Sequence, residues 1–247
     1  MSGMFRDAAN LRVADGGVAT VPLTVVEPDG PTRGAIVVLH EARQFSKALL
    51  ELMAALAVDG WLTVAPHLFH REPEVIQGDV FGDNLFADVD ATLDWLTGRD
   101  VPADTIGVLG FDAAGTAAML VATSRPVGAA VSVAARGIVE ALSVDAQALL
   151  DAAVSLQAPW LALYGEDDPD TPPEHVNRLR EATAKADVAT LVVSYAGLQH
   201  RADEPPQVPE GRDDDDPCAA AIIDARTTDI GEGGALYDQR VRLVPLS

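Results

Sequence analysis

One short segment of the sequence has the spacing of a turn that presents a reactive side chain. Residues 110–115 read Gly-Phe-Asp-Ala-Ala-Gly, so small residues stand two positions before Asp112 and two and three positions after it. Where a strand turns sharply into a helix, such small neighbours are required because the central residue has a strained, positive φ. Serine or cysteine usually occupies this centre, and Gly-x-Ser-x-Gly occurs nowhere in the chain. The segment predicts that Asp112 stands at a nucleophile position.

Two further candidates follow Asp112 in chain order. Asp168 comes after the predicted strand 159–165, and His200 comes after the predicted strand 189–197. Nucleophile, acid and histidine in this order can form a triad in which the acid orients the histidine. Each residue also has an ordinary interpretation, as a helix cap, a turn residue and a surface histidine respectively. Their joint occurrence, each just past a predicted strand, favours the triad.

An alternation of strand-like and helix-like segments must position these residues. Continuous β-branched runs are typical of strands buried on both faces, and apolar residues three and four apart are typical of helices with one buried side. Strands are predicted at 18–27, 34–40, 61–66, 105–111, 128–134, 159–165 and 189–197, and helices at 46–59, 86–98, 113–123, 175–186 and 218–228. This order predicts an α/β fold with a single doubly wound, mostly parallel sheet and helices on both faces. Residues that act on ligands follow the carboxyl ends of such strands.

Length and composition predict one acidic globular domain over residues 1–247. The chain has 38 Asp and Glu against 17 Lys and Arg, a formal net charge of −21, which excludes a basic face for nucleic acid and disfavours an anionic membrane. Hydrophobic residues make up 48%, enough for a core that we place at about residues 18–228. Residues 203–217 hold seven acids and four prolines and predict a surface loop, and the state of the tail, 229–247, is left open.

We expect a cytoplasmic protein that needs neither a metal nor another cofactor. The first residues lack the apolar run of a signal peptide, and no later stretch approaches the length of a membrane span. The single cysteine, Cys218, excludes an internal disulfide and a multi-cysteine metal site. His40, His67 and His70 lack the spacing of a zinc-binding helix motif. The expected partner is a small-molecule substrate, bound by a monomer or a homodimer.

Four stretches of the chain resemble the dienelactone hydrolases, a family with the α/β-hydrolase fold. They are VVLHEARQFSKALLELMAALAVDGWLTVAPHLFHR (37–71), IGVLGFDAAG (106–115), LALYGEDDPDTPPEHV (161–176) and YAGLQH (195–200). The resemblance extends over about residues 18–228 and implies the fold of that family. A cysteine, or sometimes a serine, is the nucleophile there, and the matching position in this chain is Asp112.

The same resemblance implies roles for other residues. It places the acid and the base of the triad at Asp168 and His200. It also implies that Glu41 contacts the nucleophile and that Arg71 holds a carboxylate of the substrate. The family often carries an arginine a few residues past the histidine, whereas here Arg201 is directly adjacent and no clear equivalent follows.

A hydrolytic site also needs donors for an oxyanion and cations that offset its carboxylates. Resemblance and expected geometry both indicate the backbone N–H groups of Ala113, at a helix start, and Ala42, after an early strand. Clustered carboxylates resist simultaneous ionisation, so we expect Arg71 or Arg43 to supply the compensating charge.

The carboxylate at position 112 leaves three functions open. Attack on an ester carbonyl would give a reactive mixed anhydride, whereas attack on a saturated carbon gives a stable alkyl ester that water can cleave with His200 as the base. We predict a dienelactone-hydrolase-like hydrolase of a small ester, lactone or related substrate. The first alternative is an Asp-nucleophile dehalogenase or epoxide hydrolase, although those enzymes usually have a tryptophan where this chain has Ala113. The second is a non-catalytic binding protein with the same fold.

Overall fold

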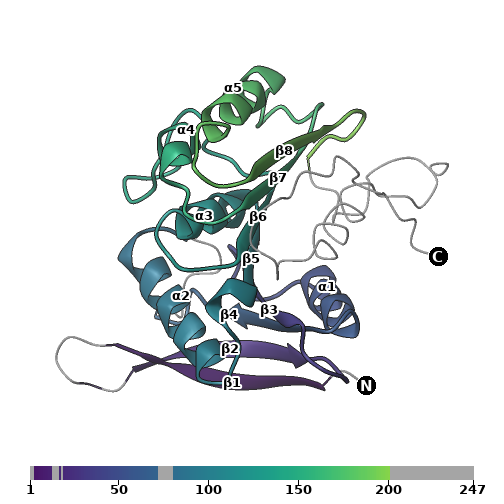
Figure 1. Cartoon of the computed structure of the whole chain (residues 1–247), viewed down its shortest axis with the longest axis vertical. Helices are drawn as coiled ribbons and strands as arrows, with labels where there is room; N and C mark the ends of the chain where they lie inside the picture. Colours follow the sequence, from purple (N-terminus) through teal and green to yellow (C-terminus); the bar gives the residue numbers. More distant parts are fainter. Residues whose placement is uncertain (1–2, 13–16, 18, 72–79, 201–247) are drawn as a thin grey trace.

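The computed structural model describes residues 3–12, 17, 19–71 and 80–200 (Figure 1). The predicted acidic loop, the predicted helix 218–228 and the C-terminal tail lie outside the described residues, as do Arg201 and Cys218. Within the described part, none of the helices combines the length and the apolar character that crossing a membrane requires.

A single eight-stranded sheet organises the described chain. Its strands are β1 (Gly3–Leu11), β2 (Ala19–Glu27), β3 (Gly34–Leu39), β4 (Trp61–Pro66), β5 (Ile106–Phe111), β6 (Ala129–Val133), β7 (Trp160–Gly165) and β8 (Thr190–Tyr195). They lie in the order β1-β2-β4-β3-β5-β6-β7-β8. The six strands from β4 to β8 in this order run parallel, and the first two pairings are antiparallel. The predicted mostly parallel α/β sheet is confirmed.

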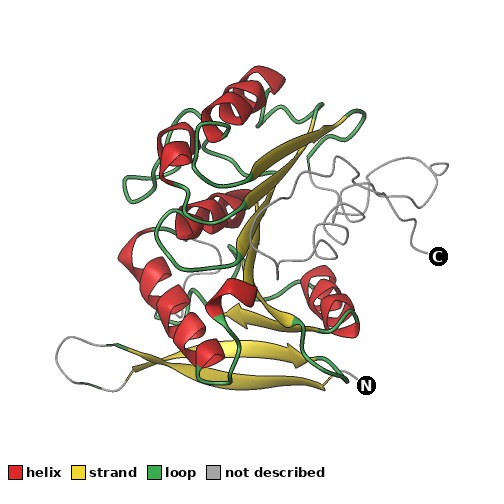
Figure 2. Cartoon of the chain, viewed as in Figure 1, coloured by secondary structure: helices red, strands yellow, loops and turns green. Residues whose placement is uncertain are grey.

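Helices cover both faces of this sheet, as predicted. They are α1 (Lys47–Val58), α2 (Gly82–Thr97), α3 (Asp112–Ala122), α4 (Leu149–Ala152) and α5 (Pro173–Thr183), with short 3₁₀ turns at Ala103–Thr105 and Ala153–Ser155. Figures 1 and 2 show α1 on one face and α2, α3, α4 and α5 on the other. Because the strands from β4 to β8 run parallel, their carboxyl ends share one edge of the sheet, where ligands bind in folds of this kind.

The central strands are apolar throughout because both of their faces are covered. Every residue of β3 is buried, and its successive side chains belong to two separate hydrophobic clusters. Val37 packs in the larger cluster on the α2 and α3 side, whereas Ile36 and Val38 pack in the smaller cluster with residues of α1. This division follows from the alternation of side chains along a strand. It explains why the run 34–40 shows no polar alternation.

Local chain signals fix α1 as the sequence predicts. The Ser46 hydroxyl accepts a hydrogen bond from Leu49 N–H at 3.1 Å, so Ser46 is the N-cap. Gly60 follows the helix with φ +92°, a conformation that glycine adopts without strain. The next strand begins at once, at Trp61.

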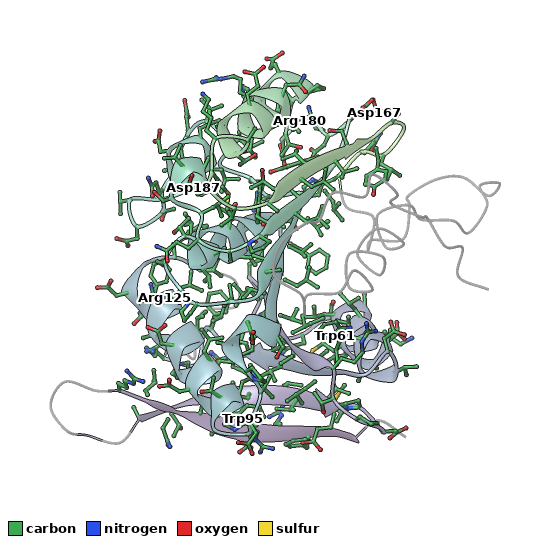
Figure 3. The ribbon with its side chains drawn as sticks, viewed as in Figure 1. Trp61, Trp95, Arg125, Asp167, Arg180 and Asp187 are labelled. Atoms are coloured by element: carbon green, nitrogen blue, oxygen red, sulfur yellow. The ribbon has the colours of Figure 1, made fainter. Side chains whose placement is uncertain are left out.

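The structure contains one strand, β1, that the sequence analysis does not predict. β1 pairs along its whole length with β2, from Gly3 opposite Glu27 to Leu11 opposite Ala19. It is an edge strand in which exposed residues alternate with partly buried ones, and Arg6, Asp7 and Asn10 interrupt its apolar pattern. Side-chain contacts hold it to α2, where Trp95 Nε1 donates to Asp7 at 3.2 Å. Figure 3 shows Trp95 on α2 beside this edge of the sheet.

Candidate active site

The turn from β5 to α3 has the geometry that its small residues predict. Asp112 has φ +53°, a left-handed conformation that is uncommon outside glycine. The helix comes so close to the strand that a Cβ at Gly110 would lie 2.0 Å from the carbonyl oxygen of Ala114. The N-cap position is Phe111, and Asp112 is the first helical residue. The helix-cap interpretation of Asp112 is therefore wrong.

His200 lies between two buried carboxylates. Its Nε2 is 2.6 Å from Asp112 Oδ1, and its Nδ1 is 2.8 Å from Asp168 Oδ2. The carboxylate side chains of Asp112 and Asp168 are 7% and 1% exposed, whereas the imidazole is 34% exposed. The structure thus brings together the three residues that the sequence proposes as a triad, and only the histidine is open to solvent.

Backbone packing at the ends of β7 and β8 places the histidine. A Cβ at Gly165 would lie 2.2 Å from the carbonyl oxygen of Gln199, so glycine is needed for the loop before His200 to pass this close. Asp167 N–H donates to the carbonyl oxygen of Leu198 at 3.1 Å and ties the two loops together. His200 is therefore positioned by the sheet edge itself.

Asp168 is both a turn residue and the partner of His200. Its Oδ1 accepts from Asp170 N–H at 2.9 Å, and its Oδ2 accepts from the Thr171 hydroxyl at 3.0 Å. These bonds fix the rotamer of the carboxylate, and Oδ2 also faces Nδ1 of His200. The two interpretations of Asp168 are compatible, because the turn holds the side chain in place for the histidine.

The two carboxylates determine the charge state of His200. Burial alone would lower the pKa of its imidazole, but the hydrogen bond to Asp168 and the charges of Asp112 and Asp168 outweigh that effect. The pKa of His200 is consequently raised above its ordinary value. The contact of Nδ1 with Asp168 is a hydrogen bond, and the close approach of Nε2 to Asp112 also favours the charged form of the ring.

The two predicted oxyanion donors lie at the same sheet edge. Ala113 stands in the first turn of α3, where backbone N–H groups have no acceptor within the helix. Ala42 follows β3, and its carbonyl oxygen is 2.5 Å from Nδ1 of His40, whose Nε2 is 2.8 Å from the carbonyl oxygen of Pro66. His40 thus links the loop after β3 to the end of β4. Burial lowers the pKa of His40 to about 4.

The cation that faces Glu41 differs from the expected one. Glu41 Oε2 lies 3.6 Å from Nη2 of Arg136, which stands on the loop after β6. Arg43 instead donates from Nη1 to the carbonyl oxygen of Phe69 at 3.1 Å. Among the contacts of the site, His200 faces Asp112 and Asp168, and Arg136 faces Glu41. The compensating role expected of Arg43 stays a prediction.

Arg71 is bound to a carboxylate of its own. Its Nη1 and Nη2 donate to the two oxygens of Asp88 on α2, at 2.9 and 2.6 Å, and Nε2 of His70 is 3.3 Å from the same carboxylate. The side chain of Asp88 is 1% exposed and that of Arg71 is 29% exposed. This bidentate pair fixes the loop after β4 to α2. A substrate-binding role of Arg71 stays a prediction.

One group in the described part of the chain has donor atoms close enough for a cation. Asp168, Asp170 and His200 each offer a ligand atom, and these atoms lie within 4.8 Å of one another. The direct contact between His200 Nδ1 and Asp168 already explains this proximity.

The sequence analysis did not identify Arg136 or Asp88. The signal for Arg136 was present, because it follows the predicted strand 128–134 at the sheet edge that carries the other candidates. The pairing of Asp88 with Arg71 joins a helix to a loop, and the residue spacing within one element does not predict such a contact.

The fold and the strand–helix turn at Asp112 define a class of protein, the α/β hydrolases. Residues 21–221 match the model of the dienelactone hydrolase family, and the chain belongs to that family.

Individual relatives agree with this assignment. A candidate carboxymethylenebutenolidase of Yersinia pestis is 27% identical over 203 residues, which cover 75% of this chain and 76% of that protein. A candidate carboxymethylenebutenolidase of Escherichia coli K12 is 26% identical over 187 residues, or 70% of this chain and 69% of that protein. The crystal structure of a candidate dienelactone hydrolase from Klebsiella pneumoniae has a TM-score of 0.67 at 24% identity, covering 80% of this chain and 88% of that chain. The crystal structure of a dienelactone hydrolase-like promiscuous phosphotriesterase from metagenomic libraries has a TM-score of 0.60 at 19% identity. The match covers 80% of this chain and 83% of that chain.

Proposed function

We propose that this protein is a hydrolase of a small ester, lactone or related compound, and that Asp112 forms a covalent ester with the substrate. The observation that carries the proposal is the position of Asp112 at a left-handed strand–helix turn, with His200 Nε2 2.6 Å from its carboxylate and Asp168 on the other ring nitrogen. The family assignment supports hydrolysis, and the names of the two bacterial relatives indicate a butenolide, which is a lactone.

The charge state of the site favours attack by Asp112 on a saturated carbon. A carboxylate needs no base to become a nucleophile, and His200 between two carboxylates is suited to hold a proton rather than to accept one. Direct activation of a water by His200 is therefore disfavoured in the free protein. Attack on a carbonyl carbon would give an anhydride at least as reactive as the substrate, whereas attack on a saturated carbon gives a stable alkyl ester.

The first step prepares the second. In the first step, Asp112 Oδ bonds to the carbon, and the electron pair of the broken bond leaves with the displaced group. Esterified Asp112 is neutral, so the pKa of His200 loses one of the charges that raise it. The imidazolium therefore gives up its proton more readily, to the displaced group or to solvent, and the neutral ring can then act as a base. His200 then takes a proton from water, the hydroxide adds to the Asp112 carbonyl carbon, and the alcohol leaves with that proton.

Backbone donors and Asp168 assist the second step. The tetrahedral intermediate on Asp112 carries an oxyanion, for which we propose the N–H groups of Ala113 and Ala42. Asp168, held by Asp170 N–H and Thr171, keeps the imidazole oriented and stabilises its charged form.

Trapping the ester on Asp112 tests the proposal. In a His200→Ala variant the ester can form but loses its base for hydrolysis, so it accumulates. The variant is incubated with β-butyrolactone, styrene oxide, 4-nitrophenyl acetate and chloroacetate, and intact mass and peptide mapping locate the adduct. We expect a stoichiometric adduct on the peptide that contains Asp112 with at least one substrate attacked at a saturated carbon.

Two controls make the outcome specific. Adding Asp112→Asn to the His200→Ala background removes the adduct. Adding Asp100→Asn leaves it unchanged, because Asp100 is an aspartate with a similarly positive φ, +64°, that lies before β5 at the opposite edge of the sheet. Steady turnover of a substrate by an Asp112→Asn variant at the wild-type rate would overturn the proposal.

A further inference from the structure

Arg136 is fixed beside the first turn of α3 by its backbone. It stands on the loop after β6, two residues past Ala134, which has a positive φ of +50°. The hydroxyl of Thr116 donates to the Arg136 carbonyl oxygen at 2.6 Å and lies 3.5 Å from the carbonyl oxygen of Asp112. Thr116 is fully buried, so this anchor is rigid. The backbone of Arg136 is thereby held one helical turn from Asp112.

The side chain of Arg136 reaches across the end of β5. It approaches Glu41, which follows β3, and β3 and β6 are the two neighbours of β5 in the sheet. Since adjacent strands lie about 4.8 Å apart, the pair spans about 10 Å across the strand that ends at Asp112. The guanidinium is consequently at the same edge of the sheet as the candidate nucleophile.

Arg136 retains hydrogen-bonding capacity for a ligand. Its contact with Glu41 is 3.6 Å long, beyond the range of a good N–H···O bond, and its buried Nε has no hydrogen-bond partner among the described residues. The side chain is 37% exposed. Arg71 and Arg125 differ, because each donates two hydrogen bonds to one aspartate. A guanidinium has five N–H donors in a fork that fits an oxyanion.

We propose that Arg136 binds the oxyanion that leaves when Asp112 attacks a saturated carbon. This inference rests on the proposed function and narrows its substrate to strained oxygen rings, namely epoxides and β-lactones. When the C–O bond breaks, its electron pair stays on oxygen, and the alkoxide or carboxylate formed is stabilised by the N–H groups of Arg136. The opened ring remains attached through the Asp112 ester, and an alkoxide takes its proton from the imidazolium of His200, or from water in a His200→Ala variant. A halide leaving group gains less from a fork of oxygen-directed donors.

Rates of the first step test this role. In the His200→Ala background, formation of the Asp112 adduct is followed by intact mass with styrene oxide and with (2-bromoethyl)benzene. We expect Arg136→Gln to slow the epoxide reaction by about 100-fold and the bromide reaction by less than about 3-fold. Arg136→Lys keeps the charge and gives an intermediate rate with the epoxide. Arg125→Gln is the matched control, at the far end of α3, and leaves both rates unchanged; Figure 3 shows Arg125 well away from the edge that carries Asp167.

Anion binding tests Arg136 independently of turnover. Titration of acetate into an Asp112→Asn variant is followed by calorimetry, which needs no reaction at Asp112. We expect Arg136→Gln to weaken acetate binding by roughly 10-fold or more, and Glu41→Gln to strengthen it because a competing negative charge is removed. A purely structural contact between Arg136 and Glu41 would instead lower the melting temperature in both variants and leave acetate affinity unchanged.

The outcomes separate the two proposals. Acetate affinity that depends on Arg136, without any adduct on Asp112, would support the anion site and contradict the proposed nucleophile. Equal slowing of the epoxide and bromide reactions, or unchanged acetate affinity in both Arg136→Gln and Arg136→Lys, would overturn the role of Arg136.

Discussion

Asp112 and Asp88 are both buried carboxylates held by a cationic side chain, yet their surroundings differ in two respects. Asp88 lies in the middle of α2, in ordinary helical geometry, and accepts two hydrogen bonds from Arg71. Asp112 lies at the first position of α3 with a positive φ and faces His200. One carboxylate is held by a residue that keeps its charge at every relevant pH, and the other by a residue that can release its proton.

This difference separates a structural ion pair from a reactive one. Breaking the contact between Asp88 and Arg71 leaves a charge without its partner, so Asp88 contributes to folding. Asp112 is conformationally strained, and its partner is 34% exposed and titratable. Strain together with a titratable partner is typical of functional sites, and this contrast predicts opposite effects of mutation in the two places.

The largest expected effect is the loss of activity in Asp112→Asn. Asparagine tolerates a positive φ, so the turn is retained and the free energy of unfolding changes by less than about 1 kcal/mol. The nucleophile is lost, and kcat/KM falls by about 10³-fold or more, a barrier increase of at least about 4 kcal/mol. Steady-state kinetics and urea denaturation of the same preparations measure both quantities. An Asp112→Asn variant that loses stability but keeps its activity would show that Asp112 is a structural residue, like Asp88.

Asp88→Asn is expected to show the opposite pattern, with a smaller energy. The guanidinium of Arg71 loses a bidentate partner in a mostly buried place, which costs about 2–3 kcal/mol of folding free energy, at the lower end for a broken buried pair because Arg71 is partly exposed. Urea denaturation measures the loss. A loss of folding free energy below about 0.5 kcal/mol would show that Asp88 contributes no more to stability than Asp112 does.

Changes of pH give the next effect, because the imidazole that faces Asp112 is titratable. The folded-state pKa of His200 is raised, so the stability that its charged form contributes is fully present below the unfolded pKa of about 6.5 and is lost as the pH rises through the folded value. The difference in unfolding free energy between wild type and His200→Gln should therefore shrink from about pH 6 to pH 9. A difference for His200→Gln that grows with pH would contradict this assignment.

His40 gives a pH effect of opposite sign. Its pKa is lowered to about 4 by burial, so the unfolded chain binds the proton more tightly between about pH 6.5 and 4. The stability contributed by neutral His40 is present above about pH 6.5 and is lost as the pH falls toward 4. A His40→Gln variant should therefore lose less stability than wild type between these pH values, measured by urea denaturation at each pH. Parallel curves for the two proteins would exclude a neutral, buried His40.

The sequence allowed the fold and the triad residues to be predicted where the signal is local. The small residues around Asp112 report the turn from β5 to α3 directly, because a Cβ at Gly110 would overlap the helix backbone. Asp168 and His200 follow strands whose apolar runs are unmistakable. For these residues, knowing that parallel strands end at one edge was enough to place them together.

Contacts between side chains of separate elements could not be predicted in the same way. Glu41 and Arg136 meet only because β3 and β6 flank β5, and the strand order is not encoded in the spacing of the strands. Arg71 meets Asp88 through the packing of a loop on α2. The edge strand β1 was missed because its short apolar pattern is interrupted by polar residues, and it is held by pairing with β2.

An oxygen-isotope experiment tests the central role of Asp112 most directly. Wild-type protein in excess over styrene oxide or β-butyrolactone completes one turnover in water enriched in ¹⁸O, and mass spectrometry locates the label. Water that cleaves the ester attacks the Asp112 carbonyl carbon, so the account predicts ¹⁸O in the carboxylate of the peptide containing Asp112 and unlabelled product. Labelled product with an unlabelled Asp112 peptide would show that water attacks the substrate itself, and would contradict the account.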